Sequence, residues 1–334
     1  MPTLPVDKIH PERILKELRR LWVDLGKQEQ QGVLRACAMT LVALVDDDGD
    51  AAAAGELIAA LMHEHPSRAI VVRMSEATES ALSAQVLAQC WMPFGRRQQI
   101  CCEQVEIKAS RPDWNDLPSV LGGLLVPDLP VVIYSPSKFA LAPELGGLLP
   151  YATKLIVNTC TRGASRDALE EWKTLATQTE RTTLFGDLAW GRTTPWRQSM
   201  AQIFDEADCS SAWQGLTDIS VRFVTPEPKT VVYYLAGWFN QSLRGSVKVS
   251  LEHTEGVDSV GINGIEMKGT KFSASLRMVE SGALETRIGK RTRLTMFPEA
   301  SDYDALRQEL NILGPDPVFE RSLHSALQVA GVSR

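Results

Sequence analysis

Alternating apolar and polar stretches along the chain predict the order of its helices and strands. The segment from Leu34 to Val45 is an almost unbroken apolar run, which is typical of a strand buried on both faces. A helix over 51–62 and a second apolar strand over 69–73 follow it. Such a strand, helix, strand unit builds parallel sheets. Two further β-like stretches, 84–91 and 100–109, are placed to pair with each other as an antiparallel extension.

The alternation of strands and helices continues toward the middle of the chain. In order, the pattern predicts a helix over 117–125, a strand over 131–134, a strand over 154–157, a helix over 167–177 and a strand over 182–185. This repetition predicts an α/β fold in which flanking helices cover a mostly parallel layered sheet.

The pattern changes after about residue 218. A helix around 231–239 leads into short strands with two hairpin signals, Asn263-Gly264 for a type I′ turn and Gly289-Lys290 for a type II′ turn. The remaining predicted elements are two strands around the second turn and two closing helices, over 284–288, 292–297, 301–313 and 317–330. This part is expected to be an α+β domain with an antiparallel sheet.

An amphipathic helix precedes the first strand. Its apolar residues recur at helical spacing: Ile14, Leu18, Leu21, Trp22 and Leu25. The helix packs on its own domain or docks on a partner protein, and the spacing fits both. We divide the chain into this arm (1–28), an N-terminal α/β domain (29–163) and a C-terminal α+β domain (164–334). The boundary is placed in the polar segment 161–165, with 207–211 as the alternative.

The composition narrows the function classes. The chain has 334 residues, enough for two domains, and 35 Lys and Arg against 41 Asp and Glu give a net charge of −6. An acidic balance argues against nucleic acid as the main partner. No apolar run approaches the roughly 18 to 20 residues that span a bilayer, and the N-terminal residues are charged rather than signal-like. We expect no membrane partner and a cytoplasmic location.

Six cysteines are present, and none forms a CxxC pair: Cys37, Cys90, Cys101, Cys102, Cys160 and Cys209. They lie mostly in apolar, strand-like segments, which is typical of reduced core thiols. The neighbouring Cys101 and Cys102 alternate across a predicted strand, so one of the two is expected to face the core and the other is not.

An α/β sheet suggests a nucleotide-binding protein, so phosphate-binding loops are considered first. The sequence contains neither GxGxxG nor GxxxxGK[ST]. The loop after the first strand, Asp46-Asp47-Asp48-Gly49-Asp50, is acidic and would repel a pyrophosphate, so we interpret it as a solvated turn. No GxSxG elbow occurs, and His63 and His65 have no companion ligands at metal spacing. We therefore predict no catalytic residues, no cofactor and no metal.

Four basic residues crowd one predicted hairpin: Arg287, Lys290, Arg291 and Arg293. They form a weak candidate for an anion site, such as one for the phosphate of a sugar. The alternative is a solvated edge hairpin whose charges prevent aggregation.

Residues 187–197 set two tryptophans and two arginines around a predicted strand-to-helix turn. Thr194 suits the N-cap of the helix, and Pro195 suits its first position. Trp196 opens an apolar face that Met200, Ile203 and Phe204 continue, so we expect it to be buried. Trp190, Arg192 and Arg197 are expected to face outward.

Three segments carry a resemblance to a known family. The first is Asp187-Leu188-Ala189-Trp190-Gly191-Arg192-Thr193-Thr194-Pro195-Trp196-Arg197 with Met200-Ala201-Gln202-Ile203-Phe204-Asp205. The others are His65-Pro66-Ser67-Arg68 and Val126-Pro127-Asp128-Leu129-Pro130-Val131. In this order they resemble the OpcA family of bacterial glucose-6-phosphate dehydrogenase assembly proteins, over residues 30 to 300 or so.

The resemblance implies a non-catalytic protein that binds glucose-6-phosphate dehydrogenase, promotes its active oligomer and raises its activity. It would thereby support NADPH production by the oxidative pentose phosphate pathway. The alternative is an enzyme or sensor that binds a sugar phosphate or nucleotide.

Trp190, Arg192, Arg197 and Asp187 are the candidate partner-binding residues, because Trp and Arg dominate interface energetics. Their alternative role is structural, with Asp187 pairing with Arg192 or Arg197 inside the domain.

His65, Pro66 and Arg68 are interpreted as structural. Pro66 would stop the preceding helix, and Arg68 would anchor its strand locally.

Overall fold

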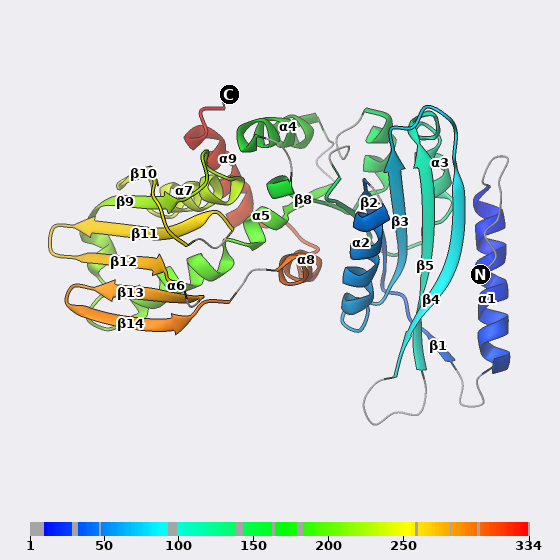
Figure 1. Cartoon of the computed structure of the whole chain (residues 1–334), viewed down its shortest axis with the longest axis horizontal. Coiled ribbons are helices and arrows are strands. Elements are labelled where there is room, and N and C mark those ends of the chain that lie inside the picture. The colour runs from blue at the N-terminus through cyan, green and yellow to red at the C-terminus, as the bar shows by residue number, and fades with distance from the viewer. Residues whose placement is uncertain are drawn as a thin grey trace. The chain divides into compact units, whose positions relative to one another are not determined.

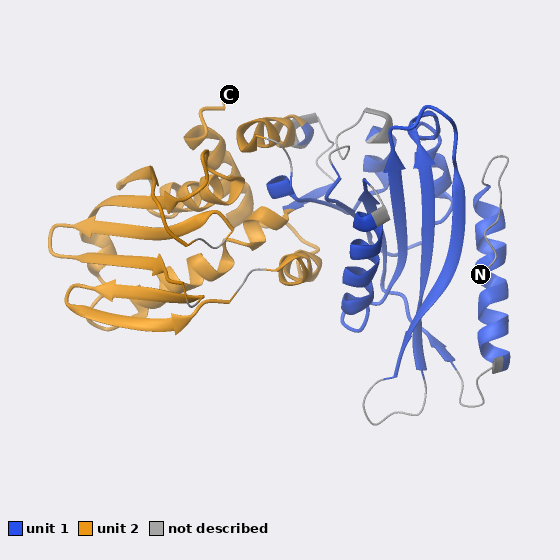
Figure 2. Cartoon of the chain, viewed as in Figure 1, with its two compact units in different colours: residues 1–161, 175–186 blue, residues 162–174, 187–334 orange. Residues whose placement is uncertain are grey.

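The chain forms two compact units (Figure 2). A computed structural model describes residues 10–28, 33–46, 48–92, 99–137, 143–161, 164–178, 183–257, 260–280, 282–298 and 301–332. The first unit comprises residues 1–161 and 175–186, and the second comprises 162–174 and 187–334. Parts of four expectations lie outside the described residues: the start of the arm (1–9), Asp47 of the acidic loop, 162–163 of the boundary and Thr182 of the last predicted strand.

In the described part of the first unit, eight strands form one sheet (Figure 1). They are β1 (Val33–Arg35), β2 (Met39–Val45), β3 (Ser67–Ser75), β4 (Ser83–Trp91), β5 (Gln99–Ser110), β6 (Val131–Ser135), β7 (Lys154–Val157) and β8 (Leu184–Asp187). The sheet order is β1-β5-β3-β2-β6-β7-β8, with β4 pairing antiparallel to β5. The pairs β1/β5, β5/β3, β3/β2, β2/β6 and β6/β7 are parallel. The predicted mostly parallel sheet and its antiparallel extension are confirmed.

The central strands are apolar runs because both faces of the sheet are covered. All seven residues of β2 are buried. The single strand predicted over 34–45 is two strands, β1 and β2, and β1 pairs with β5 rather than with the neighbours of β2. The expected burial on both faces holds for β2 but not for β1, where Leu34 and Arg35 are exposed.

Helices complete the first unit. They are α1 (Pro11–Gln28), α2 (Asp48–Leu61) and α3 (Leu117–Gly122), with short 3-10 turns at Arg111–Asp113, Pro143–Tyr151 and Thr159–Thr161. A fourth helix, α4 (Ser165–Gln178), has residues in both units. The α1 helix packs on β4 and buries Ile14 and Leu18, so it packs on its own unit, as one of the two interpretations expects. The α2 helix begins three residues earlier than predicted, because Asp48, Gly49 and Asp50 form its first turn. The negative charge of Asp50 is favourable in this first turn.

The second unit contains a six-stranded sheet within the described residues (Figure 1). Its elements are α5 (Leu188–Gly191), α6 (Thr194–Asp205), a 3-10 turn (Ala212–Gly215), β9 (Leu216–Phe223), α7 (Thr230–Ser242), β10 (Lys248–His253), β11 (Ile262–Gly269), β12 (Ser273–Met278), β13 (Ala283–Ile288), β14 (Arg291–Met296), α8 (Asp302–Asn311) and α9 (Pro317–Val329). The order is β10-β9-β11-β12-β13-β14, antiparallel except for the parallel pair of β10 and β9. The predicted α+β architecture is confirmed.

Helix α7 packs on this sheet and against α9. Its buried residues include Val231, Tyr234 and Leu235. The contact with α9 is close at Gly237, where a Cβ atom would lie 2.5 Å from the carbonyl oxygen of Ser322. A larger residue at that position would push the two helices apart.

The two predicted hairpin turns have different outcomes. Gly289 has a φ of 55° and lies between β13 and β14, so the turn at Gly289-Lys290 is confirmed. The turn predicted at Asn263-Gly264 is wrong, because both residues lie inside β11. A Cβ atom at Gly264 would lie 2.4 Å from the carbonyl oxygen of Leu276, so the glycine permits the close approach of β12.

Candidate functional site

The tryptophan and arginine motif begins where β8 ends. Asp187 is fully buried and caps the N-terminus of α5, where one carboxylate oxygen accepts a hydrogen bond from the N–H of Ala189 (2.9 Å). The other oxygen accepts a hydrogen bond from the hydroxyl of Tyr234 on α7 (2.9 Å). This one carboxylate therefore links α5 to α7.

Trp190 lies in an aromatic cluster. Its ring packs edge-on to Tyr234, with 6.1 Å between centroids, and lies 5.9 Å from the ring of Phe319 on α9. On the adjoining side, a Cβ atom at Gly191 would lie 3.2 Å from the Cβ of Ala305, so α5 and α8 are in close contact. The short α5 helix thus packs against α7, α8 and α9.

Arg197 covers the indole from the side of α6. Its guanidinium carbon lies 3.8 Å from the centroid of the Trp190 ring. Its Nε donates to the hydroxyl oxygen of Thr193 (3.0 Å), and Nη2 donates to that of Thr194 (2.8 Å). The cation is therefore held by an aromatic face and two hydroxyl groups.

Burial lowers the pKa of Arg197 to about 10, while the carboxylates of Asp316 and Glu309 act in the opposite direction. The group is still a cation at neutral pH, because that pKa lies well above 7. It therefore supplies positive charge for packing or recognition, and it cannot act as a proton-transfer group near pH 7.

The motif also fixes α8. Arg192 is buried and forms an ion pair with Asp302 in the first turn of α8. Thr194 donates to the side chain of Gln308 (3.0 Å). These contacts hold α8 against the start of α6.

The expectation that Trp190 and Arg192 face outward is wrong. Their exposed fractions are 4% and 8%, because α8 and α9 cover them. Arg197 is half-buried. A direct role of these residues and Asp187 in partner binding stays a prediction.

The start of α6 differs from the prediction by one residue. Thr193 occupies the N-cap, the helix begins at Thr194, and Pro195 lies in the first turn. The predicted burial of Trp196 is confirmed, and its ring packs on Phe297 with 4.9 Å between centroids.

The segment from His65 to Arg68 lies in the first unit, where His65 and Pro66 follow α2, and Ser67 and Arg68 open β3. Pro66 follows the turn after α2, and its carbonyl oxygen accepts a hydrogen bond from the N–H of Ala38 (2.7 Å). Arg68 is buried, and its Nη1 donates to the carbonyl oxygen of Leu124 (2.7 Å). Arg68 therefore anchors its strand locally.

Glu103 on β5 is a buried carboxylate at the centre of a polar cluster that the sequence did not reveal. It pairs with Arg68 of β3 (2.6 Å) and Arg35 of β1 (2.8 Å), and it accepts a hydrogen bond from the indole N–H of Trp22 on α1 (2.5 Å). The available signal was weak, because β5 also carries Gln104, Glu106 and Lys108, so a further glutamate in this strand does not stand out. The cluster ties α1, β1, β3 and β5 together.

The first sheet has a switch point between β2 and β6, where the strand order reverses. The order β5-β3-β2-β6-β7-β8 corresponds to 3-2-1-4-5-6, the arrangement of dinucleotide-binding folds, whose ligands bind at the carboxyl ends of the switch strands. Here the hydroxyl of Ser137, after β6, donates a hydrogen bond to Asp46, after β2. Asp50 lies nearby in sequence, in the first turn of α2. A pyrophosphate would meet carboxylates at this position, which disfavours nucleotide binding.

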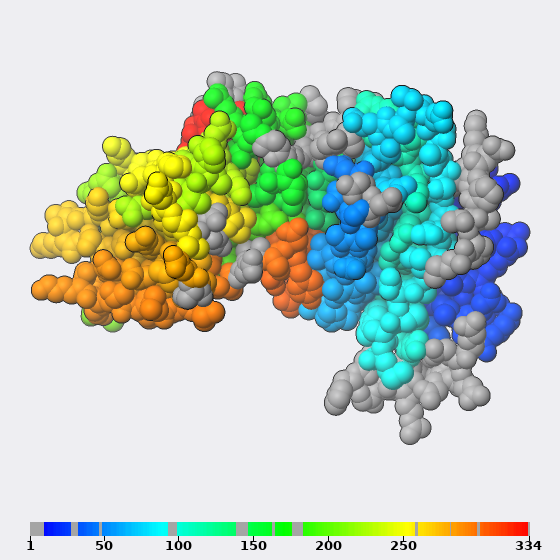
Figure 3. Space-filling model, in the orientation of Figure 1, coloured from blue at the N-terminus to red at the C-terminus, as the bar shows by residue number. Residues whose placement is uncertain are grey.

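The basic hairpin of β13 and β14 lies at the surface of the second unit, within the orange part of Figure 3. Its three arginines have carboxylate partners within 4 Å: Arg287 with Glu285, Arg291 with Glu206 and Asp208, and Arg293 with Glu206. An anion would have to compete with these carboxylates. The anion site, which includes Lys290, stays a prediction.

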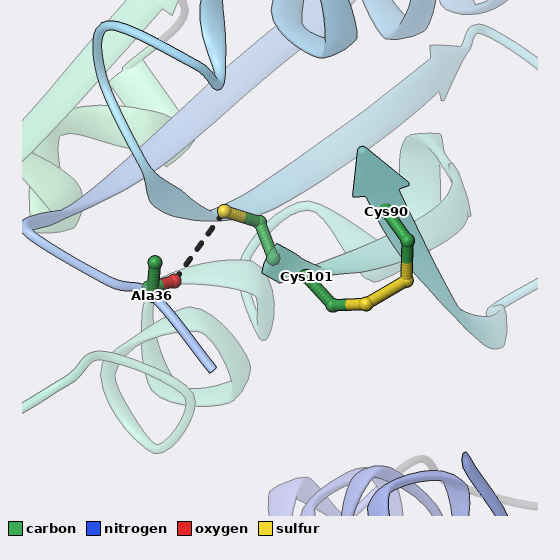
Figure 4. Close-up of a disulfide and its surroundings, with 4 residues drawn as sticks. Ala36, Cys90 and Cys101 are labelled. Carbon is green, nitrogen blue, oxygen red and sulfur yellow. Dashed lines mark hydrogen bonds between the residues drawn. A yellow bond between two sulfur atoms is a disulfide. The ribbon is translucent and has the colours of Figure 1, made fainter. Parts of the chain in front are cut away.

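The expectation that all six cysteines are reduced is wrong. Cys90 on β4 and Cys101 on β5 form a disulfide across directly opposed residues, with Cα atoms 4.1 Å apart (Figure 4). Cys101 and Cys102 are both fully buried, so the expectation that only one of them faces the core is also wrong. The thiol of Cys102 donates to the carbonyl oxygen of Ala36 (3.3 Å). Both faces of β5 are covered, which the sequence pattern did not show.

The described residues also bear on metal binding and on membrane spanning. No group of three or more His, Cys, Asp or Glu side chains is placed to hold a metal ion there. In the same residues, no helix has the length and apolar character needed to cross a membrane.

The fold and its sites define a class of protein with an α/β unit followed by an α+β unit. The first unit has the strand order of dinucleotide-binding folds, with an acidic switch point in place of a glycine-rich loop. Two family models match the chain. The glucose-6-phosphate dehydrogenase subunit N-terminal domain matches residues 58–177, and the C-terminal domain of the same subunit matches 183–323. Together they cover more than half of the chain, which belongs to the OpcA family.

The sequence identity to an individual relative is low. The chain is 25% identical over 235 residues to the putative OxPP cycle protein OpcA of Synechocystis sp., a match that covers 68% of this chain and 47% of the relative. The chain thus spans about half the length of that relative.

Among solved structures, the chain is similar to levoglucosan dehydrogenase in complex with NADH and L-sorbose (TM-score 0.45, 12% identity, 87% of this chain and 97% of that chain). It is also similar to an oxidoreductase from Sinorhizobium meliloti (TM-score 0.48, 10% identity, 87% and 95%).

Proposed function

We propose that this protein is a non-catalytic assembly factor that binds glucose-6-phosphate dehydrogenase, favours its active oligomer and raises its activity. It would support NADPH production by the oxidative pentose phosphate pathway, in the cytoplasm with that enzyme. Membership of the OpcA family carries the proposal, because both family models are described as parts of a glucose-6-phosphate dehydrogenase subunit. The printed name of the Synechocystis relative, an OxPP cycle protein, supports the pathway.

The chemistry of the described sites supports a non-catalytic role. Asp46 and Asp50 give the switch point a negative charge that opposes binding of NADP. In the motif, Asp187 and Tyr234 are buried and hydrogen-bonded to each other, and Arg197 is engaged by Trp190. These polar groups are occupied in holding helices together.

An activator acts by binding the active form of its target more tightly than the inactive form. Because Trp190 and Arg192 are buried within this chain, we propose that they contribute indirectly, by holding α8 and α9 in place. Arg197 is half-buried and is the motif residue that a partner can contact directly.

An activity titration tests the proposal. The purified chain is added to the dehydrogenase from the same organism while the initial rate and the mass of the complex are followed together. We expect the rate to rise in proportion to a heavier species that contains both proteins. A dehydrogenase whose rate and mass stay unchanged at saturating chain would refute the proposal.

Variants of the motif show whether its residues contact the dehydrogenase directly or act by holding helices of this chain in place. Arg197→Ala and Arg192→Ala are compared for dehydrogenase binding after their folding has been checked. Weaker binding by a folded Arg197→Ala variant supports direct contact, whereas unchanged binding by both variants removes the motif from the interface.

A thermal-shift measurement tests the alternative of an enzyme or sensor. Glucose-6-phosphate or NADP is added to the isolated chain, and a rise in melting temperature of several degrees supports ligand binding. Loss of that shift in an Arg291→Ala variant would locate the ligand at the basic hairpin.

A further inference from the structure

The β14 strand is an edge strand with an exposed apolar side. It is hydrogen-bonded to β13, and in the described part of the chain it is the last strand of its sheet (Figure 1). All six of its residues are exposed, and the exposed fractions of Leu294 and Met296 are 64% and 80%. Exposed edge strands with apolar side chains tend to pair with another chain unless charge, proline or a bulge protects them.

The hairpin geometry fixes which backbone groups of β14 point away from β13. In a two-residue hairpin the residues flanking the turn, here Ile288 and Arg291, exchange hydrogen bonds. Arg291 and every second residue after it point their N–H and C=O toward β13. The residues between them point these groups outward: Thr292, Leu294 and Met296. The bond from the N–H of Phe297 to the carbonyl oxygen of Gly282 agrees with this phase, because Phe297 points inward.

We propose that β14 pairs antiparallel with β14 of a second copy of this chain, with the two-fold axis at Leu294. This register uses all three outward-pointing residues. Leu294 faces Leu294 of the second copy, and Thr292 faces its Met296. The two six-stranded sheets then form one continuous sheet, and the exposed apolar side chains become cross-strand neighbours on one face.

The charges of β14 are compatible with pairing to a second copy of the chain. In the same register Arg293 faces Thr295 of the second copy and Arg291 faces its Phe297, so no two cations are directly opposed. Glu206 lies within 4 Å of both arginines of its own chain. These arginines are therefore compensated before pairing, and they do not protect the edge as unpaired charges would.

The surface area buried by the strand pair sets the expected affinity of the dimer. One pair of six-residue strands buries less than the roughly 1,200 Å² of a standard stable interface. We therefore expect a dimer that dissociates on dilution. Its formation needs only the isolated chain, so it does not depend on the proposed binding of a dehydrogenase.

The mass of the full chain in solution tests the pairing. Light scattering across a dilution series should show the mass rising from 36.8 kDa toward twice that value with concentration. Leu294→Lys should keep the chain monomeric, since two ammonium groups would meet at the axis. Val23→Lys places the same charge on an exposed apolar position of α1 and should dimerise as the wild type does.

A chain that is monomeric at every concentration would overturn the proposal. A dimer that Leu294→Lys leaves intact would overturn it as well, because another surface would then hold the two copies together.

Cross-linking tests the register and remains informative if Leu294→Lys misfolds. Cα atoms of a hydrogen-bonded antiparallel pair lie about 5.5 Å apart, within reach of a disulfide. Under mild oxidation, Leu294→Cys should give a covalent dimer that reductant reverses. Thr295→Cys, on the same strand and off the axis, should give no more dimer than the wild type, whose native cysteines set the background. Equal cross-linking of the two variants contradicts the register.

Discussion

The guanidinium carbon of Arg197 lies 3.8 Å from the centroid of the Trp190 ring. The pair joins α6 to α5, and through Trp190 it reaches Tyr234 on α7 and Phe319 on α9. The two residue types that most often dominate protein interfaces here hold the domain together.

Arg197→Ala should lower the free energy of unfolding by about 2 kcal/mol, because it removes a partly desolvated cation–π contact and two side-chain hydrogen bonds. Arg197→Lys should recover only part of this, since an ammonium lacks the planar face that stacks on indole. Urea unfolding measures both changes. Arg277→Ala, an exposed arginine on β12, should stay within about 0.5 kcal/mol of the wild type. Equal stability of Arg197→Ala and Arg277→Ala would contradict a stabilising stack.

The hydrogen bond between Tyr234 and Asp187 should be measurable as a coupling energy. Tyr234→Phe should cost about 1.5–3 kcal/mol in the wild-type background, because the acceptor is a buried carboxylate. In the Asp187→Ala background the same change should cost less, by an interaction energy of at least about 0.5 kcal/mol. The hydroxyl of Tyr303 makes no hydrogen bond to the described residues, so Tyr303→Phe is the matched control. Additive effects in the double variant would mean that the bond contributes nothing.

Removing the carboxylate of Glu103 should be strongly destabilising. Glu103→Ala leaves the buried guanidinium of Arg68 without its carboxylate, a situation that costs about 3–5 kcal/mol. Adding Arg68→Met should recover a large part of the loss, because the uncompensated charge is then gone. Glu252→Ala, which breaks an exposed pair with Arg222, should cost less than about 1 kcal/mol in the same denaturation assay. A Glu103→Ala variant no less stable than Glu252→Ala would show that Glu103 is not a structural centre.

Secondary structure and fold class could be predicted from the sequence because their signals are local. The buried run of β2 and the periodic faces of α6 and α9 are produced by neighbours a few residues apart. The exposure of the motif could not be predicted, because the covering helices α8 and α9 begin more than a hundred residues after Trp190. A tryptophan on a short segment looks the same in sequence whether a distant helix covers it or not.

The disulfide is intermediate in predictability between the local elements and the burial of the motif. The strands over 84–91 and 100–109 were expected to pair antiparallel, and the observed register places Trp91 opposite Ile100. That register opposes Cys90 and Cys101. Aligning the adjacent ends of the two predicted strands would therefore have found the bond, whereas the search for CxxC spacing could not.

The Cys90–Cys101 disulfide should contribute about 3 kcal/mol, since it closes a loop with a sequence separation of 11 in the unfolded chain. Reductant should lower the urea midpoint of the wild type, and the double variant Cys90→Ser with Cys101→Ser should be indifferent to it. Thiol titration of the unfolded protein should count four thiols without reductant and six with it. Six thiols in freshly purified, unreduced protein would show that the bond does not form.

Cys102 should make stability fall in alkaline solution. Burial, assisted by Cys37 and Glu103, raises the pKa of its thiol from 9.0 to about 11, against a hydrogen bond from the backbone of Ser67. In the unfolded chain the thiol loses its proton near pH 9, whereas in the folded chain it keeps the proton until about pH 11. Its contribution is therefore complete below pH 9 and is lost as the pH rises through about 11.

The free energy of unfolding, measured by urea at a series of pH values, checks this pH dependence. Cys102→Ala should show a smaller loss than the wild type between about pH 9 and 11, because it lacks the titrating thiol. Cys209→Ala also removes a buried thiol and should keep the full loss, since Cys102 is intact. The same shift should slow alkylation of Cys102 at pH 8, because only the thiolate reacts. Parallel curves for the wild type and Cys102→Ala would show that burial does not hold the proton on this sulfur.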